Sequence, residues 1–309
     1  MATLHTDPLA GLVLVTADLR IWSGGVKLTR EEDLTEVASK LPPKGMVSDG
    51  RKMLVRPAAL APFHAIRKRL ERLLGRVGFK LMPDAWAIPE TDCENFLTEV
   101  EELESEFNGL VPDFLVSLPR HYAEQEQEFP EWALQLRFGH LTPEQVESRM
   151  RFQVGMYRIS PPADGNSRLN RRYDDVVNGA VPALLTDVAD KATKLLEGAI
   201  GRKLTCTQAH KGQVERLVDR LDAFSFMDHR VGPTASALRS MMGCIPALGP
   251  LTPGNTAVLR VICEQLADPA TALQDLAIGE DEEDTTTIPE PQITATPPMT
   301  STTNAMVGF

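Results

Sequence analysis

The sequence predicts a mostly α fold: a helical bundle with long antiparallel helices and a small β element near the N-terminus, an α+β arrangement. Apolar residues recur at helical spacing over residues 57–77, and a heptad-like apolar series follows over 96–110. Beyond position 174, helical patterns repeat between glycines and prolines. Ahead of them, the β-branched run 11–22 is typical of a buried strand. A chain of 309 residues with 42% apolar content can bury a large core.

The segment after this first strand is expected to turn and then form a short helix. Gly24–Gly25 supplies the turn, and a second short apolar run follows at 26–28. Thr29 and Glu32 have the spacing of a capping box. That spacing predicts a helix over residues 30–40.

An amphipathic helix with a basic face is predicted over residues 57–77. Its apolar side chains, beginning with Leu60, Phe63 and Ile66, step by three and four residues. Cations near the carboxyl end of a helix also interact favourably with its dipole. The basic face carries four of them: Lys68, Arg69, Arg72 and Arg76.

An acidic helix is predicted next. Thr91 and Glu94 have capping-box spacing, and the apolar residues over 96–110 then step by four and three. Such a seam packs at the shallow crossing angle of helical hairpins, and the preceding basic helix is the nearest candidate partner. Pro112 and Pro119 predict breaks or kinks further along.

The charge distribution allows two interpretations of this helix pair. Between Lys44 and Lys80 there are ten Lys or Arg against two acidic residues, and between Asp84 and Glu147 sixteen Asp or Glu against two Arg. Either the two helices pair their charges internally, or the basic face stays free for an anionic partner. We favour a face that is solvated or paired internally, because five glutamates lie on the acidic helix within residues 99–106.

The chain downstream alternates short elements. A helix is predicted within residues 131–152, with a break at Gly139 and a new start at Thr142, where Pro143 suits the first helical position. Residues 153–159 could form a strand.

The second half is expected to be a helical bundle. Its predicted helices cover residues 174–200, 207–224, 233–243 and 255–267. Pro182 predicts either a kink or the meeting of two helices.

Three regions are therefore predicted along the chain. Residues 1–160 would form an N-terminal α+β domain with the basic and acidic helices, and residues 161–278 a C-terminal helical bundle. Residues 279–309 hold six acidic side chains, no Lys or Arg, and many Thr and Pro. Such a composition predicts a disordered tail.

A second basic group consists entirely of arginines and is a candidate contact for nucleic acid or another anion: Arg149, Arg151, Arg158, Arg168, Arg171 and Arg172. Tyr157 and Tyr173 lie beside them in the sequence, and proteins that bind single strands combine arginines with stacking aromatics. The net charge of −11 and the lack of a nucleic-acid motif weigh against a dedicated binder.

Two spacings resemble parts of metal sites. Cys206 and His210 are four residues apart, as in a two-ligand half-site, and His121, Glu124 and Glu128 form an incomplete carboxylate and imidazole group. Neither completes a ligand set, so we predict no metal and no cofactor. The chain also has no nucleophile elbow, Walker loop or dinucleotide loop, so no catalytic residue is predicted.

The compartment is predicted from the cysteines and from hydropathy. Four widely spaced cysteines without a C-x-x-C pair suggest reduced, buried thiols. No window reaches the roughly 18 uninterrupted apolar residues of a membrane span. We therefore expect a soluble, cytoplasmic protein.

A pattern of apolar and turn residues runs through the first two-thirds of the chain: Ala17–Gly24, Lys27–Leu28, Leu41–Pro43, Leu60, Phe63, Gly78–Phe79, Ala87–Pro89 and Phe107. This pattern resembles that of an uncharacterised family of phages, conjugative plasmids and integrative elements, a domain of unknown function. The resemblance implies that genes of this kind lie beside genes for a MoxR-type AAA+ ATPase and a von Willebrand A type protein. It offers no functional residue.

Three functions remain open from the sequence. The leading hypothesis is a non-enzymatic helical interaction or adaptor protein of a mobile genetic element, acting with a protein partner such as a MoxR-type AAA+ ATPase. The alternative is a nucleic-acid-associated protein in phage or plasmid DNA processing that uses the six arginines. The third is a metal-dependent hydrolase built on the neighbourhood of His121.

Overall fold

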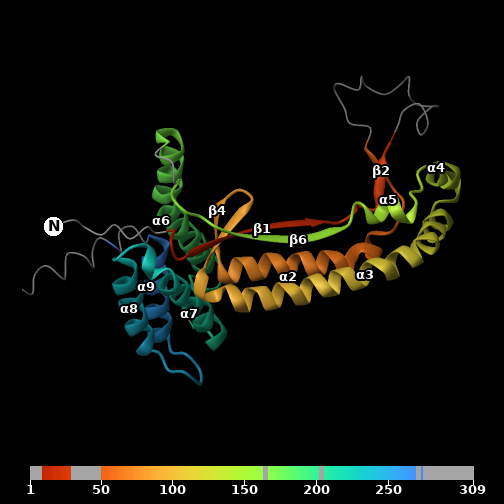
Figure 1. Cartoon of the computed structure of the whole chain (residues 1–309). Coiled ribbons are helices and arrows are strands. Elements are labelled where there is room, and N and C mark those ends of the chain that lie inside the picture. The colour runs from red at the N-terminus through yellow and green to blue at the C-terminus, as the bar shows by residue number, and fades with distance from the viewer. Residues whose placement is uncertain (1–8, 29–49, 163–165, 202–204, 269–272, 274–309) are drawn as a thin grey trace, which may run out of the picture.

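The computed structural model describes residues 9–28, 50–162, 166–201, 205–268 and 273. Figure 1 shows an arm made of two long helices and a β-ribbon, with a helical bundle at one end and a cluster of short elements at the other. The fold is mostly helical with a small antiparallel sheet, as the sequence predicts.

The arm is an antiparallel helical hairpin. Helix α2 spans Ala61–Val77, after a 3₁₀ turn at Pro57–Leu60, and helix α3 spans Cys93–Glu128. At 1.5 Å per residue, α3 is about 54 Å long. Leu70 of α2 and Val100 of α3 belong to one buried cluster, and the Phe63 ring packs edge-on against those of Phe107 and Phe114. The predicted packing of the basic helix on the acidic helix is confirmed.

The predicted start of α3 is wrong, and so is the predicted possibility of a break at its prolines. The helix begins at Cys93 after a 3₁₀ turn at Glu90–Asp92, and Thr91 does not cap it. It also runs without a break through Pro112 and Pro119. Both prolines are exposed and seven residues apart, so they lie on the solvent side and leave the buried face uninterrupted. Their effect is limited to curvature, which Figure 1 shows along the far half of the helix.

A four-stranded antiparallel sheet lies along the arm, in the order β4-β5-β1-β6. Its strands are β1 (Leu12–Arg20), β4 (Phe79–Met82), β5 (Ala85–Pro89) and β6 (Arg151–Arg158). The strand expected at 153–159 thus exists and pairs with β1 along its whole length, Val13 opposite Arg158 and Arg20 opposite Arg151. Strand β4 was missed from the sequence, as was the sheet that unites these segments.

The two faces of β1 enter two different cores. Val13 and Val15 pack with the α2–α3 hairpin, whereas Leu12 and Leu14 pack with the helices of the second half. This follows from the alternation of side chains along a strand. The sheet is therefore a shared layer between the arm and the bundle.

Short elements gather at the far end of the arm. A second, two-stranded sheet joins β2 (Gly25–Lys27) to β3 (Arg51–Met53), and helices α4 (Ala133–Phe138) and α5 (Pro143–Glu147) lie beside it in Figure 1. Gly139 ends α4, and a capping box between Thr142 and Gln145 begins α5. The break at Gly139 and the start at Thr142 were predicted from the sequence, whereas the capping-box partner Gln145 was not.

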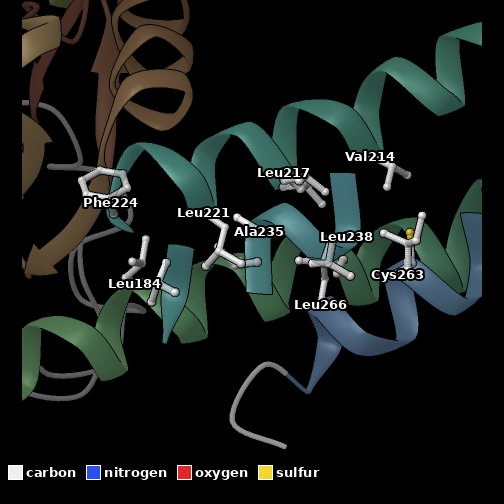
Figure 2. Packing of buried hydrophobic residues seen from close by; sticks show 14 of the residues in the cluster. Leu184, Val214, Leu217, Leu221, Phe224, Ala235, Leu238, Cys263 and Leu266 are labelled. Atoms are coloured by element: carbon white, nitrogen blue, oxygen red, sulfur yellow. The ribbon is translucent and has the colours of Figure 1, made fainter. Parts of the chain in front are cut away.

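The second half forms the predicted helical bundle. Its helices are α6 (Ser167–Leu195), α7 (Gln208–Ala223), α8 (Val231–Gly243) and α9 (Pro253–Ala267), with one π-helical turn at Leu196–Ile200 after α6. Figure 2 shows side chains from all four helices meeting in one core, among them Leu184, Leu221, Leu238 and Leu266. Pro182 lies inside α6, and Thr186 donates its hydroxyl to the Pro182 carbonyl at 2.8 Å. No second helix begins there.

A buried arginine joins the bundle to the end of α2. Arg220 of α7 donates to the carbonyls of Gly75 (2.7 Å), Arg76 (3.1 Å) and Gly78, and it pairs with Asp187 of α6 at 2.7 Å. The last carbonyls of a helix have no partner within the helix, and cations suit its negative end. Arg220 is therefore a C-terminal cap supplied from more than 140 residues away.

Some predictions fall outside the described residues. They are the helix over 30–40, the tail 279–309 and the centre of the proposed boundary near 163–165. The division near residue 160 stays a prediction, and the second core draws in Leu12 and Phe79 from the first region. Within the described residues, the helices are too short or too polar to cross a bilayer.

We predict that Arg220→Met lowers the free energy of unfolding by about 3 kcal/mol or more, because it leaves Asp187 and the carbonyls of α2 without their partner. Chemical denaturation measures the loss. The matched control is Arg239→Met, since Arg239 pairs with Asp219 and Asp222 on the surface, and exposed pairs contribute less than about 1 kcal/mol. Equal losses in the two variants would show that Arg220 is not a structural joint.

We predict that the core cysteines resist alkylation in the native state. Burial above all, then Cys206 and Glu264, raises the pKa of Cys263 to about 12, whereas Cys244 is exposed. Because the thiolate is the reactive species, iodoacetamide at pH 8 should label Cys244 first and reach Cys206 and Cys263 only after unfolding. Peptide mass spectrometry reports each site. Labelling of Cys263 as fast as that of Cys244 would contradict the packing in Figure 2.

Candidate functional site

The basic face of α2 is partly neutralised by α3. Arg69 pairs with Glu106 and Arg76 pairs with Glu99, across the antiparallel hairpin. The four side chains of these pairs remain about half exposed. Internal pairing is therefore confirmed for two of the four cations predicted on this face.

The other two cations of this face behave differently. Arg72 donates from Nε to the backbone carbonyl of Lys68 at 3.2 Å. Within the described residues, neither Arg72 nor Lys68 contacts a carboxylate. The face thus keeps positive charge at its centre.

The six arginines of the second basic group do not form one patch. Arg151 and Arg158 lie at opposite ends of β6, about 23 Å apart at 3.3 Å per residue. Arg151 contacts Asp18 and Arg158 contacts Glu90. Arg149 precedes the β6 strand, close to α5.

Only the N-terminal part of α6 brings several of these arginines close together. Arg168, Arg171 and Arg172 are exposed there within one and a half turns, and Arg172 lies 3.6 Å from Asp175. Figure 1 places this end of α6 far from α5. A continuous track of six arginines is thus not what the fold presents.

The two metal half-sites are engaged in other interactions. Cys206 is buried and its backbone donates to Thr256, while His210 accepts from the Thr207 backbone through Nδ1 and so caps α7. At the other place, Glu124 pairs with Arg120, and Glu128 pairs with Arg56. Among the described residues, no three potential ligands converge on one point.

The far end of the arm exposes a set of large apolar side chains. Of the eleven that the described residues expose, four lie within ten consecutive residues: Phe129, Trp132, Leu134 and Phe138. Leu134 is 62% exposed and Phe138 is 75% exposed. Single exposed apolar residues are ordinary, whereas a group of them is a candidate interaction surface. We call these four residues the apolar tip.

The backbone beneath the apolar tip is held firmly. Lys52 of β3 donates to the Gln135 carbonyl at 2.9 Å, Arg137 pairs with Glu126 at 2.8 Å, and Leu136 is buried. A firmly held surface loses little conformational entropy on binding, which favours a docking role.

The apolar tip presents both a hollow and a ridge. Phe129 and Trp132 line a hollow of about 240 Å³ together with Leu28, Met53 and Leu136. Leu134 and Phe138, four residues apart, share one face of α4. A hollow beside projecting apolar side chains suits the anchor residues of a protein partner.

Sequence reasoning missed the apolar tip. The run 129–138 contains alternating apolar and polar residues that look like an ordinary amphipathic helix. The available signal was its shortness between Pro130 and Gly139, because the short helix α4 and the turn before it leave little buried face for Phe129, Trp132, Leu134 and Phe138 together.

A hairpin arm with a small sheet, a helical bundle and an apolar tip together define a mostly helical α+β protein. Comparison with known protein families matches residues 9–268 to the family described as protein of unknown function, DUF3150. The chain belongs to this family. No curated protein and no solved structure matches it.

We predict that the region under the apolar tip loses stability in mild acid. Burial, the largest cause, lowers the pKa of His140, which stacks on Tyr122 with ring centroids 3.9 Å apart; Arg137 also lowers it and Glu126 opposes. The unfolded chain therefore binds a proton more readily than the native state.

Stability contributed by neutral His140 is present above pH 6.5 and is lost as the pH falls through the lower native pKa. Denaturation midpoints at pH 7.5 and pH 5.5 measure this loss. His140→Phe keeps a ring against Tyr122 and should reduce the difference between the two midpoints. An unchanged difference would show that other groups control the acid response.

Proposed function

We propose that the protein is a non-enzymatic adaptor that binds a protein partner through its apolar tip. The exposure of Phe129, Trp132, Leu134 and Phe138 on a firmly held backbone carries this proposal. Aromatic side chains are enriched at interface centres, where a few anchors supply most of the binding energy.

Charge contributes little to this docking surface. Helix α3 holds ten Asp or Glu and one Arg, but five of these acids lie within Glu99–Glu106, at the end of the helix away from the apolar tip. Beside the apolar tip, the glutamates of the last turns pair with arginines: Glu124 with Arg120, Glu126 with Arg137 and Glu128 with Arg56. The proposal therefore rests on apolar contact.

The partner we propose is a MoxR-type AAA+ ATPase, in a phage or another mobile genetic element. Support comes from the resemblance of the landmarks Leu60, Phe63 and Phe107 to proteins that accompany such ATPases. All three side chains are buried in the arm, so the resemblance concerns the element that positions the apolar tip.

We predict that the double variant Trp132→Ser/Phe138→Ser binds the proposed partner, a MoxR-type ATPase, at least about tenfold more weakly than the unchanged protein. Calorimetry with the two purified proteins at low salt measures the affinity. Val116→Ser/Leu248→Ser is the matched control, because Val116 (83% exposed) and Leu248 (87%) lie on the surface away from the apolar tip. The control should bind like the unchanged protein.

Three outcomes would contradict the adaptor hypothesis. Absence of binding by the unchanged protein would remove the ATPase as partner, and equal loss in both double variants would show that the apolar tip is not the docking surface. A large fall in the unfolding free energy of Trp132→Ser/Phe138→Ser would show that the chain itself covers this surface.

The nucleic-acid hypothesis stays a prediction, with its support reduced to one short segment. Arg168, Arg171 and Arg172 on α6 are the cations of that group that remain close together. Two or three phosphates at most could be contacted there, so any binding should have a shallow dependence on salt.

A further inference from the structure

A basic cleft lies where the arm meets the bundle. It has a volume of about 540 Å³ and is bordered by the end of α2, the second half of α6, and α7. Gly75, Leu195, Gln213 and Leu217 form part of its wall. Its remaining described lining residues are all cations: Arg72, Arg76, Lys191, Lys194, Arg216 and Arg220.

Three of these cations take part in contacts between the elements that meet here: Arg220 and Lys191 connect the bundle to α2, and Arg76 connects α2 to α3. Arg220 and Lys191 share Asp187, and both donate to the Gly75 carbonyl, Lys191 at 3.1 Å. Arg76 pairs with Glu99 across the hairpin. Their charges are therefore partly offset by two carboxylates that contact them.

The other three cations, Arg72, Lys194 and Arg216, have exposed side chains and come from three different helices. In the part of the chain that the structure describes, none of them contacts a carboxylate. They gather beside Arg220, whose side chain is 5% exposed and whose Nε has no hydrogen-bond partner there.

Repulsion among these cations destabilises the folded protein unless an anion binds in the cleft. Six cations offset by Asp187 and Glu99 leave four positive charges. Burial above all, and then the neighbouring charge of Arg220, lowers the pKa of Lys191. A phosphate group carries about −1.5 to −2 at pH 7, so two or three phosphates match the excess.

We propose that this cleft binds a compact ligand with two or more phosphate groups, of the kind that a nucleotide or an inorganic polyphosphate carries. Arg72, Lys194 and Arg216 contact the phosphates, and Arg220 with Lys191 forms a fixed positive base beneath them. Arginine suits this role because its planar guanidinium binds phosphate oxygens in pairs.

A long nucleic-acid strand fits the cleft less well than a compact ligand. Glu99 and Glu102 line a neighbouring hollow on the arm, which shares Arg72 and Arg76 with the cleft, and Glu215 and Asp219 line another hollow on the far side of α7. A strand leaving the cleft would pass these carboxylates. The described lining also offers no aromatic ring on which bases could stack.

Calorimetry with inorganic tripolyphosphate at low salt tests the proposal. The triple variant Arg72→Gln/Lys194→Gln/Arg216→Gln should bind at least about tenfold more weakly, because it removes three charged contacts. These side chains are exposed and lie outside the Arg220 joint, so circular dichroism and the unfolding midpoint should stay unchanged.

The matched control removes the same charge elsewhere. Arg20→Gln/Lys27→Gln/Arg120→Gln should bind tripolyphosphate within about twofold of the unchanged protein, since these exposed cations lie on the arm or at its far end and do not line the cleft.

Three results would overturn the proposal. They are no binding of tripolyphosphate by the unchanged protein, equal losses in the two triple variants, and tighter binding of a single-stranded oligonucleotide through the same three cations. ATP and pyrophosphate titrations then distinguish a nucleotide from a bare polyphosphate, and loss of both in the cleft variant supports the shared phosphate chemistry.

Discussion

The capping of α2 by Arg220 is the interaction on which the arrangement of the two halves depends. Helix α2 ends where β4 begins, and its last carbonyls face the bundle with no partner of their own. Arg220 satisfies them from α7 while Asp187 balances its charge from α6. Gly78 makes this junction possible, because a Cβ there would lie 2.5 Å from the Ala87 carbonyl oxygen. Arm, sheet and bundle are thus fixed at one point by polar contacts.

The shared sheet extends that connection along the molecule. Because Val13 and Leu14 enter opposite cores, neither the arm nor the bundle can separate from β1 without exposing apolar surface. The polar joint then selects one orientation of the bundle against the arm. Hydrophobic contact supplies most of the free energy that holds the arm and the bundle together. The buried arginine network fixes their relative orientation, because hydrogen bonds require specific geometry whereas apolar contact does not.

Sequence reasoning succeeded where the signals are local. The periodicity from Leu60 onward and the opposite charge of the next helix predict the hairpin, since both partners are adjacent in the chain. Pairing of β1 with β6 joins residues more than 130 positions apart and leaves no local pattern. Arg220 was missed because an arginine in an amphipathic helix resembles a surface residue, and its burial depends on carbonyls that only the folded chain places nearby. The candidate sites were predicted least well from the sequence, because Arg72, Lys194 and Arg216 come together only in the tertiary structure.

The position of the two proposed sites has a physical consequence. The apolar tip lies at one end of α3 and the basic cleft lies near the other, about 50 Å away along the helix. Phosphate charge in the cleft is screened well within that distance at ordinary ionic strength, so it cannot act on the tip through the solvent. Any coupling must pass through the arm, where Arg76 contacts both the cleft and Glu99 of α3. A phosphate that draws Arg76 from Glu99 would weaken one exposed pair, worth less than about 1 kcal/mol. Such a small term changes partner affinity severalfold at most, which makes the two sites nearly independent in equilibrium binding.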